Sequence, residues 1–300
     1  MITVEALNKR FKAGFEIHDV SFEVPAGHVV GFVGRNGAGK STVIRCLLGL
    51  YGLDDGFCLI DGKPLKEHAR PIAHAGAVLG PDAMQGPLTG FGNLKVLAMA
   101  NGISDETVLS LLREVGLEEA AKQKTSKYSL GMKQRLAIAA ALLGEPNNLV
   151  LDEPFNGLDP EGVHWMRELI RERADRGAAV LVSSHMLSEL EQIADAYILI
   201  DKGRLIFSGD AGELRRVLPE TSGYIVETED REAFVTLSKS QDWECERQRL
   251  RVLHVTGPGS AKELAQAASG AGILLTRIEE KRPSVEDAIL ALSQGGAHHE

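Results

Sequence analysis

The chain has 300 residues, of which 44% are hydrophobic and 25% charged, and its formal net charge is −9 at pH 7. These proportions are ordinary for a soluble globular protein, and a chain of this length buries a large core without disulfides. The acidic balance and the dispersed basic residues disfavour nucleic acid as the main partner. The three cysteines, Cys46, Cys58 and Cys245, form no CxxC pair, which disfavours a zinc site or a disulfide framework.

The chain contains no run of about eighteen apolar residues, the length that a membrane-spanning helix needs. Its N-terminus has no basic region followed by an apolar one. We therefore expect neither a transmembrane segment nor a signal peptide. If the protein serves a membrane, another chain supplies the spans.

The length favours a large domain over residues 1–215 and a smaller one over residues 223–294. The chain first shows short strand-like runs around one helix, and one of these runs is continuously apolar, as is typical of a buried strand. Residues 76–79 fit a strand and a loop equally well. The elements expected here are strands over 2–7, 15–24 and 29–33 and a helix over 40–48.

Residues from about 82 to 145 show helical spacing without strand signals, which predicts a helical subdomain within an α/β domain. Strand patterns then return and alternate with helices, so we expect a mainly parallel sheet with right-handed crossovers. The elements expected are helices over 94–100, 104–115, 130–143, 161–175 and 186–193, and strands over 149–151, 179–183, 196–200 and 204–207.

Beyond residue 222 the pattern resets to a βαββαβα order, which suggests a small α+β unit of the ferredoxin-like type. The expected strands are 224–228, 243–247, 250–256 and 273–279, and the expected helices are 231–238, 261–268 and 284–292.

A glycine-rich motif lies between the apolar run at 29–33 and the first helix, which is the context that a phosphate-binding loop needs. Its glycines let backbone N–H groups approach phosphate oxygens, and the following helix directs its positive end at the same charge. Lys40 supplies a mobile cation, Ser41 a hydroxyl for Mg²⁺, and Thr42 a second hydroxyl. The residues predicted to bind nucleotide are Gly34, Arg35, Asn36, Gly37, Ala38, Gly39, Lys40, Ser41 and Thr42.

Two carboxylates, Asp152 and Glu153, follow the apolar run at 149–151. Ligands bind at the carboxyl ends of strands in open α/β sheets, so both side chains are expected at the site. Asp152 is predicted to hold Mg²⁺. Glu153 is predicted to orient and deprotonate the attacking water, as a catalytic base.

The segment Tyr128-Ser129-Leu130-Gly131-Met132 precedes this strand and resembles, in divergent form, the signature sequence of the ATP-binding cassette (ABC) family. The resemblance covers about residues 1–215. It implies a phosphate-loop ATPase fold in which two cassettes close over ATP, with Ser129 and Gly131 contacting the γ-phosphate held by the partner. A single cassette is then not expected to be competent.

Three further positions match the family in order. The resemblance implies that residues 156–159, Asn-Gly-Leu-Asp, couple the two active sites. It implies that His185 is a catalytic histidine that contacts the γ-phosphate, and that Phe11 stacks on adenine. For Phe11, a place in the protein core is an alternative.

One position departs from the family pattern. Gly80 stands where the family carries a glutamine that contacts Mg²⁺ and the water and links to the transporter. Asp82 and Gln85 are nearby substitutes, but neither has the expected spacing. The departure puts the coupling loop in doubt rather than the nucleotide site.

The separate single cassette and its tail domain are similar to bacterial exporter subunits of the drug- and antibiotic-resistance type. The resemblance implies an ATPase at the cytoplasmic face of the membrane that uses ATP and Mg²⁺ and drives a separate transmembrane permease. It also implies a dimer of cassettes, for which we favour a homodimer and keep a heterodimer as the alternative. The alternatives are an importer subunit, a soluble ABC ATPase that acts on ribosomes or nucleic acid, and a binding-only regulator. The transported compound is not readable from the sequence.

Overall fold

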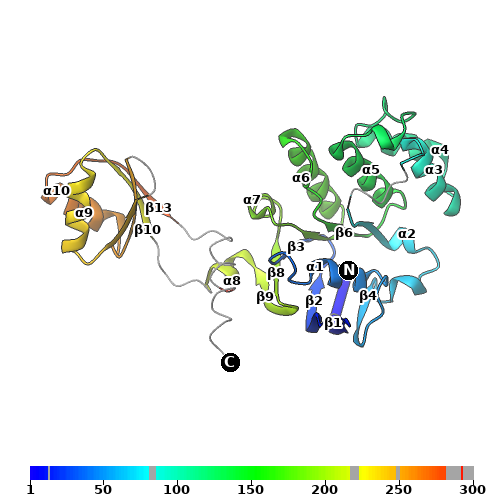
Figure 1. Ribbon diagram of the computed structural model, residues 1–300, viewed down its shortest axis with the longest axis horizontal. Coiled ribbons are helices and arrows are strands. Elements are labelled where there is room, and N and C mark those ends of the chain that lie inside the picture. Colours follow the sequence, from blue (N-terminus) through cyan, green and yellow to red (C-terminus); the bar gives the residue numbers. More distant parts are fainter. Residues whose placement is uncertain (13, 81–85, 217–222, 248–250, 282–291, 293–300) are drawn as a thin grey trace. The chain divides into compact units, whose positions relative to one another are not determined.

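The computed structural model describes residues 1–12, 14–80, 86–216, 223–247, 251–281 and 292. The chain separates into two compact units, Met1–Ala211 and Gly212–Glu300, which are described one at a time. Figure 1 shows both. We keep 1–215 and 223–294 as the proposed domain bounds. The helix expected over 284–292 lies almost wholly outside the described residues.

The first unit is built on a sheet of mostly parallel strands, in which six described strands follow the order β5-β6-β7-β3-β8-β9. Only the last pair, β8 with β9, is antiparallel. Every residue of β3, β6 and β7 is buried, as in parallel sheets covered on both faces. The strands are β3 (Val29–Val33), β5 (Ala75–Val78), β6 (Asn148–Asp152), β7 (Ala179–Ser183), β8 (Ala196–Asp201) and β9 (Arg204–Asp210).

The segment that fitted strand and loop equally well is strand β5, paired with β6. Gly76 explains this outcome, because a Cβ at this position would lie 2.0 Å from the carbonyl oxygen of Ala141. The strand thus packs directly on the helix that precedes β6, and only glycine permits this approach.

A smaller antiparallel sheet of the order β2-β1-β4 lies beside the first sheet in the same unit. Its strands are β1 (Ile2–Arg10), β2 (Glu16–Val24) and β4 (Asp55–Ile60), and sequence reasoning missed β4. In β4 the buried residues Cys58 and Ile60 alternate with more exposed neighbours, but Asp55 and Gly56 open the strand and weaken its pattern. Helix α1 (Lys40–Leu47) shares a buried core with this sheet through Val43, Ile44 and Leu47.

Helices occupy the region between β5 and β6, as expected. Hydroxyl side chains cap the main ones: Thr89, Ser104 and Ser129 accept hydrogen bonds from backbone N–H groups of the first turn. Thr89 starts the first of these helices four residues earlier than predicted. The helices of this region are α3 (Gly90–Ala100), α4 (Asp105–Glu114) and α5 (Leu130–Leu142), and the short helix α2 (Pro71–His74) directly precedes β5.

After β6 the chain forms α6 (Pro160–Asp175), capped by the Asp159 side chain, and α7 (Leu187–Leu190). The expectation of a helix over 186–193 was wrong in length, because α7 covers only four residues. Met186 occupies the N-cap position of α7, and its side chain makes no capping hydrogen bond to the first turn. The backbone N–H groups of this turn therefore gain no stabilisation from a side-chain cap.

The second unit contains an antiparallel sheet of the order β11-β12-β10-β13. This order and the βαββαβ succession of its described elements are those expected of a ferredoxin-like unit. Tyr224, Phe234, Trp243 and Leu264 are prominent in its buried core. The unit comprises α8 (Ala211–Arg216, at the junction), β10 (Gly223–Thr228), α9 (Arg231–Ser240), β11 (Glu244–Arg247), β12 (Val252–Thr256), α10 (Ala261–Gly270) and β13 (Leu275–Lys281).

Candidate nucleotide site

The glycine-rich loop leaves β3 at Val33 and enters α1 at Lys40. A Cβ at Gly34 would lie 2.3 Å from the carbonyl oxygen of Ile200, and one at Gly39 would lie 2.5 Å from Cδ1 of Ile17. Gly39 also has φ +115°, a conformation that side chains disfavour. Both positions therefore require glycine, because the loop backbone lies directly against Ile200 and Ile17 there.

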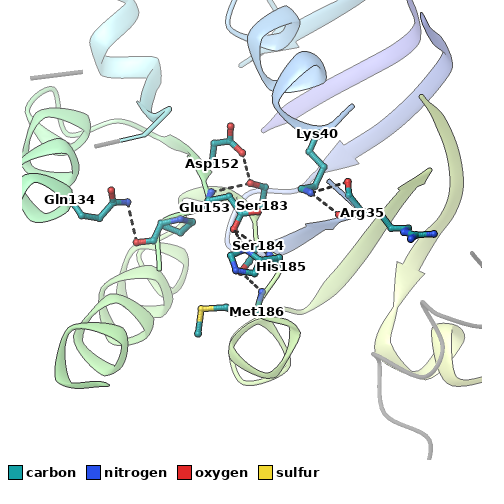
Figure 2. A network of polar contacts seen from close by, with 11 residues as sticks. Arg35, Lys40, Gln134, Asp152, Glu153, Ser183, Ser184, His185 and Met186 are labelled. Carbon is teal, nitrogen blue, oxygen red and sulfur yellow. Dashed lines mark hydrogen bonds and ion pairs between the residues drawn. The ribbon is translucent and has the colours of Figure 1, made fainter. Parts of the chain in front are cut away.

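Lys40 lies in the hollow of this loop, with its side chain almost fully buried. Its Nζ donates a hydrogen bond to the carbonyl oxygen of Gly34 at 2.6 Å, as Figure 2 shows. Burial lowers the pKa of Lys40 from its ordinary value, and the carboxylates of Glu153 and Asp152 partly oppose this shift. A cation held in this way can move onto a phosphate oxygen.

A cavity of about 390 Å³ opens over the loop. Most of the predicted nucleotide-binding residues line it, together with the predicted base. Gly34 and Ala38 do not, because Gly34 packs against Ile200 and the carbonyl oxygen of Ala38 accepts a hydrogen bond from Gly203. The cavity is lined by Phe15, Arg35, Asn36, Gly37, Gly39, Lys40, Ser41, Thr42 and Glu153.

The two carboxylates stand where β6 ends beside β7. Asp152 is buried, and its Oδ1 accepts a hydrogen bond from Oγ of Ser183 at 2.5 Å. Glu153 has φ +54°, a strained conformation for a residue other than glycine. Its N–H donates to the carbonyl oxygen and to Oγ of Ser183, at 3.1 and 3.0 Å. The two hydrogen bonds that Glu153 donates to Ser183 on the neighbouring strand thus hold the strained residue in place.

His185 follows β7 and meets Glu153 directly. Its Nδ1 lies 2.7 Å from Oε2 of Glu153, and its backbone N–H donates to the same oxygen at 3.2 Å. Figure 2 shows the contact together with Lys40 and Asp152. The structure therefore brings together the loop, the carboxylate pair and the histidine, which were predicted from segments far apart in the sequence.

Ser129 and Gly131 are not among the residues that line this cavity. Oγ of Ser129 accepts a hydrogen bond from the Met132 N–H at 3.2 Å and so caps α5. A Cβ at Gly131 would lie 3.2 Å from the carbonyl oxygen of Gly157, so this helix end touches the 156–159 loop. Within one chain, the N-terminus of α5 therefore does not contribute to the cavity over the phosphate loop.

Phe15 is a site residue that sequence reasoning missed. Its ring lines the cavity, whereas the ring of Phe11 does not. The two residues face each other across a tight turn closed by a hydrogen bond of 2.9 Å from the Phe11 N–H to the Phe15 carbonyl oxygen. The ring centroids are 6.4 Å apart, and Phe11 packs edge-on against Tyr51. The Phe-x₃-Phe spacing was the only sequence signal for Phe15. This spacing brings the two rings together only if the chain between them forms a hairpin, as it does here.

Gln134 is a second residue that was missed. Its side chain is completely buried on α5, and Nε2 donates to the carbonyl oxygen of Pro154, directly after Glu153, at 3.0 Å (Figure 2). Its Oε1 is buried without a hydrogen-bond partner in the described part of the chain. Gln134 thus ties the signature helix to the turn that carries the predicted base.

Gly80 follows the end of β5 with φ +126°, a conformation that favours glycine over glutamine. The backbone conformation at position 80 is therefore consistent with glycine in place of the glutamine of the family pattern. Asp82 and Gln85, the nearby substitutes, lie outside the described residues.

The donor set suits a magnesium ion. The hydroxyl of Ser41 and the carboxylate of Asp152 are hard oxygen ligands, and Mg²⁺ binds through one or two such groups together with substrate phosphates. Among the described residues, no cluster of three or more His, Cys, Asp or Glu forms a metal site by itself. The chemistry of these donors therefore fits an ion that arrives with a nucleotide.

A second cavity, of about 780 Å³, is larger than the loop cavity. It is lined by residues of α4, α6 and the turn before β6, and it contains none of the predicted site residues. The volume of a cavity therefore does not identify the nucleotide site. The site is identified by the glycine-rich loop, the Lys40 cation and the two carboxylates, which lie close together.

A parallel sheet with a glycine loop before α1 and a carboxylate pair on the next strand but one defines a P-loop nucleoside triphosphatase. Residues 17–156 match the family model described as ABC transporter. The chain belongs to the ABC transporter family, as one of its ATP-binding ATPase subunits.

The curated relatives agree with this assignment. The bacitracin transport ATP-binding protein BcrA of Enterococcus faecalis is 33% identical over 302 residues, covering 99% of this chain and 97% of that protein. The uncharacterised ABC transporter ATP-binding protein YhcH of Bacillus subtilis is 41% identical, over 69% of this chain and 68% of YhcH. The lantibiotic transport ATP-binding protein SrtF of Streptococcus pyogenes is 36% identical, over 69% of this chain and 89% of SrtF.

Solved structures agree as well. The ATP-binding subunit of an ABC transporter is 33% identical, with a TM-score of 0.65 over 72% of this chain and 92% of that one. A dimeric cassette in a post-hydrolysis state with ADP and phosphate shares the fold, at 22% identity and a TM-score of 0.64, over 70% of this chain and 98% of that one. None of the described helices is long and apolar enough to cross a membrane.

Proposed function

We propose that this chain drives the export of an antibiotic peptide through a separate permease at the cytoplasmic face of the membrane. The observation that carries the proposal is the match to a bacitracin transport ATP-binding protein along nearly the whole of both chains. A relative named for Nod factor export supports export rather than import, and one named for lantibiotic transport supports an antibiotic peptide as the cargo. The net charge of −9 disfavours a role on ribosomes or DNA.

In this proposal the loop residues bind the triphosphate, and Lys40 leaves the carbonyl oxygen of Gly34 for the β- and γ-phosphates. Ser41 and Asp152 would hold Mg²⁺. When bound, the ion neutralises charge on the phosphate oxygens. Phe15 covers the nucleotide beside the loop, and Phe11 supports it from the far side of the hairpin.

Glu153 accepts the proton of the attacking water as the water oxygen bonds to the γ-phosphorus and the bond to the bridging oxygen of ADP breaks. His185 already holds the Glu153 carboxylate at 2.7 Å. When the γ-phosphate draws the imidazole toward itself, the carboxylate becomes free to take the water. The strained backbone of Glu153, held by Ser183, keeps the base directed at the cavity.

Closure of two cassettes completes the site. Ser129 and Gly131, at the start of α5, contact the γ-phosphate bound by the second copy, since a helix N-terminus is a good anion site. A Cβ at Gly131 would lie 3.2 Å from the carbonyl oxygen of Gly157, and in this proposal the 156–159 loop links the two sites. A homodimer satisfies this arrangement because both copies carry both halves.

The test starts from the full chain expressed in its host, purified from membranes in mild detergent together with whatever membrane protein it binds. We expect a multi-spanning protein to copurify, and we expect bacitracin-type peptides to stimulate ATP hydrolysis by the pair. The matched control is Lys40→Ala, which retains the partner and loses the stimulated hydrolysis. Recovery of ribosomal RNA in place of a membrane protein, or ATP hydrolysis that bacitracin-type peptides do not stimulate, would overturn the proposal.

A further inference from the structure

The second unit presents a strand edge that no described strand covers. β13 ends the sheet order β11-β12-β10-β13, so it pairs with β10 on one side only. It is seven residues long, Leu275–Lys281. The unpaired N–H and C=O groups of such an edge are a template for another strand.

The side chains of β13 fall into two rows. Ile278 pairs with the buried Val226 of β10 and therefore faces the helices of the unit. Arg277 and Glu279, on either side of it, face the opposite, outer surface. They form an ion pair with each other and are 53% and 55% exposed. A basic and an acidic group thus stand at equal distances from one central apolar residue.

We propose that β13 pairs antiparallel with β13 of a second copy, centred on Ile278. This register sets Arg277 of each copy opposite Glu279 of the other, and Ile278 opposite Ile278. Side chains directly opposite in an antiparallel pair have Cβ atoms about 4.5–5.5 Å apart, close enough for an ion pair. Charged side chains on an edge usually oppose pairing, but here the order of charges is complementary to itself.

The apolar surface beside this edge supports the same occupant. A groove of about 380 Å³ runs between α10 and β13, and Ala265, Leu275 and Ile278 contribute to its lining. Leu274, at its end, is 74% exposed. In the proposed pair, the two Ile278 side chains meet at the margin of this groove. Their contact removes apolar surface from water in both copies.

The complementarity is specific to this strand and this register. Moving the centre to Glu279 would set Arg277 opposite Lys281, which places like charges together. The other edge strand, β11, centred on Cys245, would set Glu244 opposite Glu246. Like charges directly opposite destabilise a strand pair.

The experiment uses the full chain without nucleotide, so that ATP-driven closure of the cassettes does not contribute. Light scattering over a dilution series measures the dissociation constant of the dimer. We expect the wild-type chain to dimerise, and we expect Arg277→Glu or Glu279→Arg alone to weaken the dimer about 10-fold or more. The matched control is Lys262→Glu, on the exposed side of α10, which leaves the dissociation constant unchanged.

The decisive measurement is an equimolar mixture of the two single variants. The Arg277→Glu chain carries acidic groups at both positions and the Glu279→Arg chain basic groups at both, so only a mixed dimer is complementary. We expect the mixture to recover the wild-type dissociation constant. An ion pair within one chain cannot be restored by mixing, so a mixture that stays monomeric would overturn the proposal, as would a wild-type chain that is monomeric throughout. Neither result bears on ATP hydrolysis or cargo.

Discussion

The contact between Glu153 and His185 makes Glu153→Gln the most informative substitution in the cassette. Glutamine preserves the size of the side chain, its place in the cavity lining and an oxygen that accepts from the His185 N–H. It removes the proton-accepting carboxylate. General base catalysis contributes about 10²–10⁴-fold to rate, so kcat should fall by that factor, which corresponds to about 2.7–5.5 kcal/mol of transition-state stabilisation.

The cost in stability should be far smaller. The imidazole of His185 is 56% exposed, and ion pairs of this exposure contribute about 0–1 kcal/mol. The backbone hydrogen bonds from Glu153 to Ser183 do not depend on the side chain that is changed. The variant should therefore keep its fold and its affinity for ATP while losing turnover.

Three measurements on the same preparations check this prediction: phosphate release with excess ATP, equilibrium binding of ATP, and light scattering with and without ATP and Mg²⁺. All variants are compared in a chain that also carries Glu279→Arg, so that the β13 pairing proposed above does not contribute to the dimer. We expect slow turnover, unchanged affinity and an accumulated ATP-bound dimer. Lys40→Ala serves as the comparison, since it should lose affinity and dimer together. Turnover within about 3-fold of wild type would refute Glu153 as the base, because the lower limit for base catalysis is about 100-fold.

Further predictions concern residues outside the sequence motifs. Phe15→Leu should weaken ATP binding about 2–10-fold, from an aromatic contribution of about 0.5–1.5 kcal/mol, and leave tripolyphosphate binding unchanged; a larger effect of Phe11→Leu would contradict the placement of the rings. Gln134→Met should lower the free energy of unfolding by about 1–3 kcal/mol in urea titrations, because the Pro154 carbonyl loses its partner, and Gln134→Asn should not rescue it. Burial raises the pKa of Cys46 to about 11 and of Cys58 to about 12, so iodoacetamide at pH 8 should modify them only after denaturation, as mass spectrometry would show.

The motifs on the central sheet were predictable because each combines local chemistry with a strongly apolar strand. Val29–Val33 and Ala179–Ser183 coincide with the predicted strands, since fully buried runs leave little doubt about their ends. The site followed from these strands, because the carboxyl ends of parallel strands meet at one edge. Glu153 follows β6 and His185 follows β7, and these two strands are paired. The two side chains therefore meet, although 30 residues of sequence separate Glu153 from Ser183 at the end of β7.

What escaped prediction depends on tertiary contact. The burial of Gln134 and its bond to Pro154 exist only once α5 packs against the turn after β6. Phe15 could be distinguished from Phe11 only when the hairpin had placed one ring over the loop and the other against Tyr51. β4 was missed because its first two residues, Asp55 and Gly56, are poor strand formers, and pairing with β1 overrides that preference.

The position of β3 has a consequence for synthesis on the ribosome. This strand carries the phosphate loop, yet both of its neighbours come from the far end of the unit: Val29 pairs with Val180, and Val30 pairs with Ala196. A nascent chain that has completed α5 can already consolidate its helices through local contacts, while β3 still lacks both partners. The apolar residues of β3 then remain exposed until β7 and β8 have left the ribosome. Chaperone binding and aggregation should therefore be most frequent during this interval of translation.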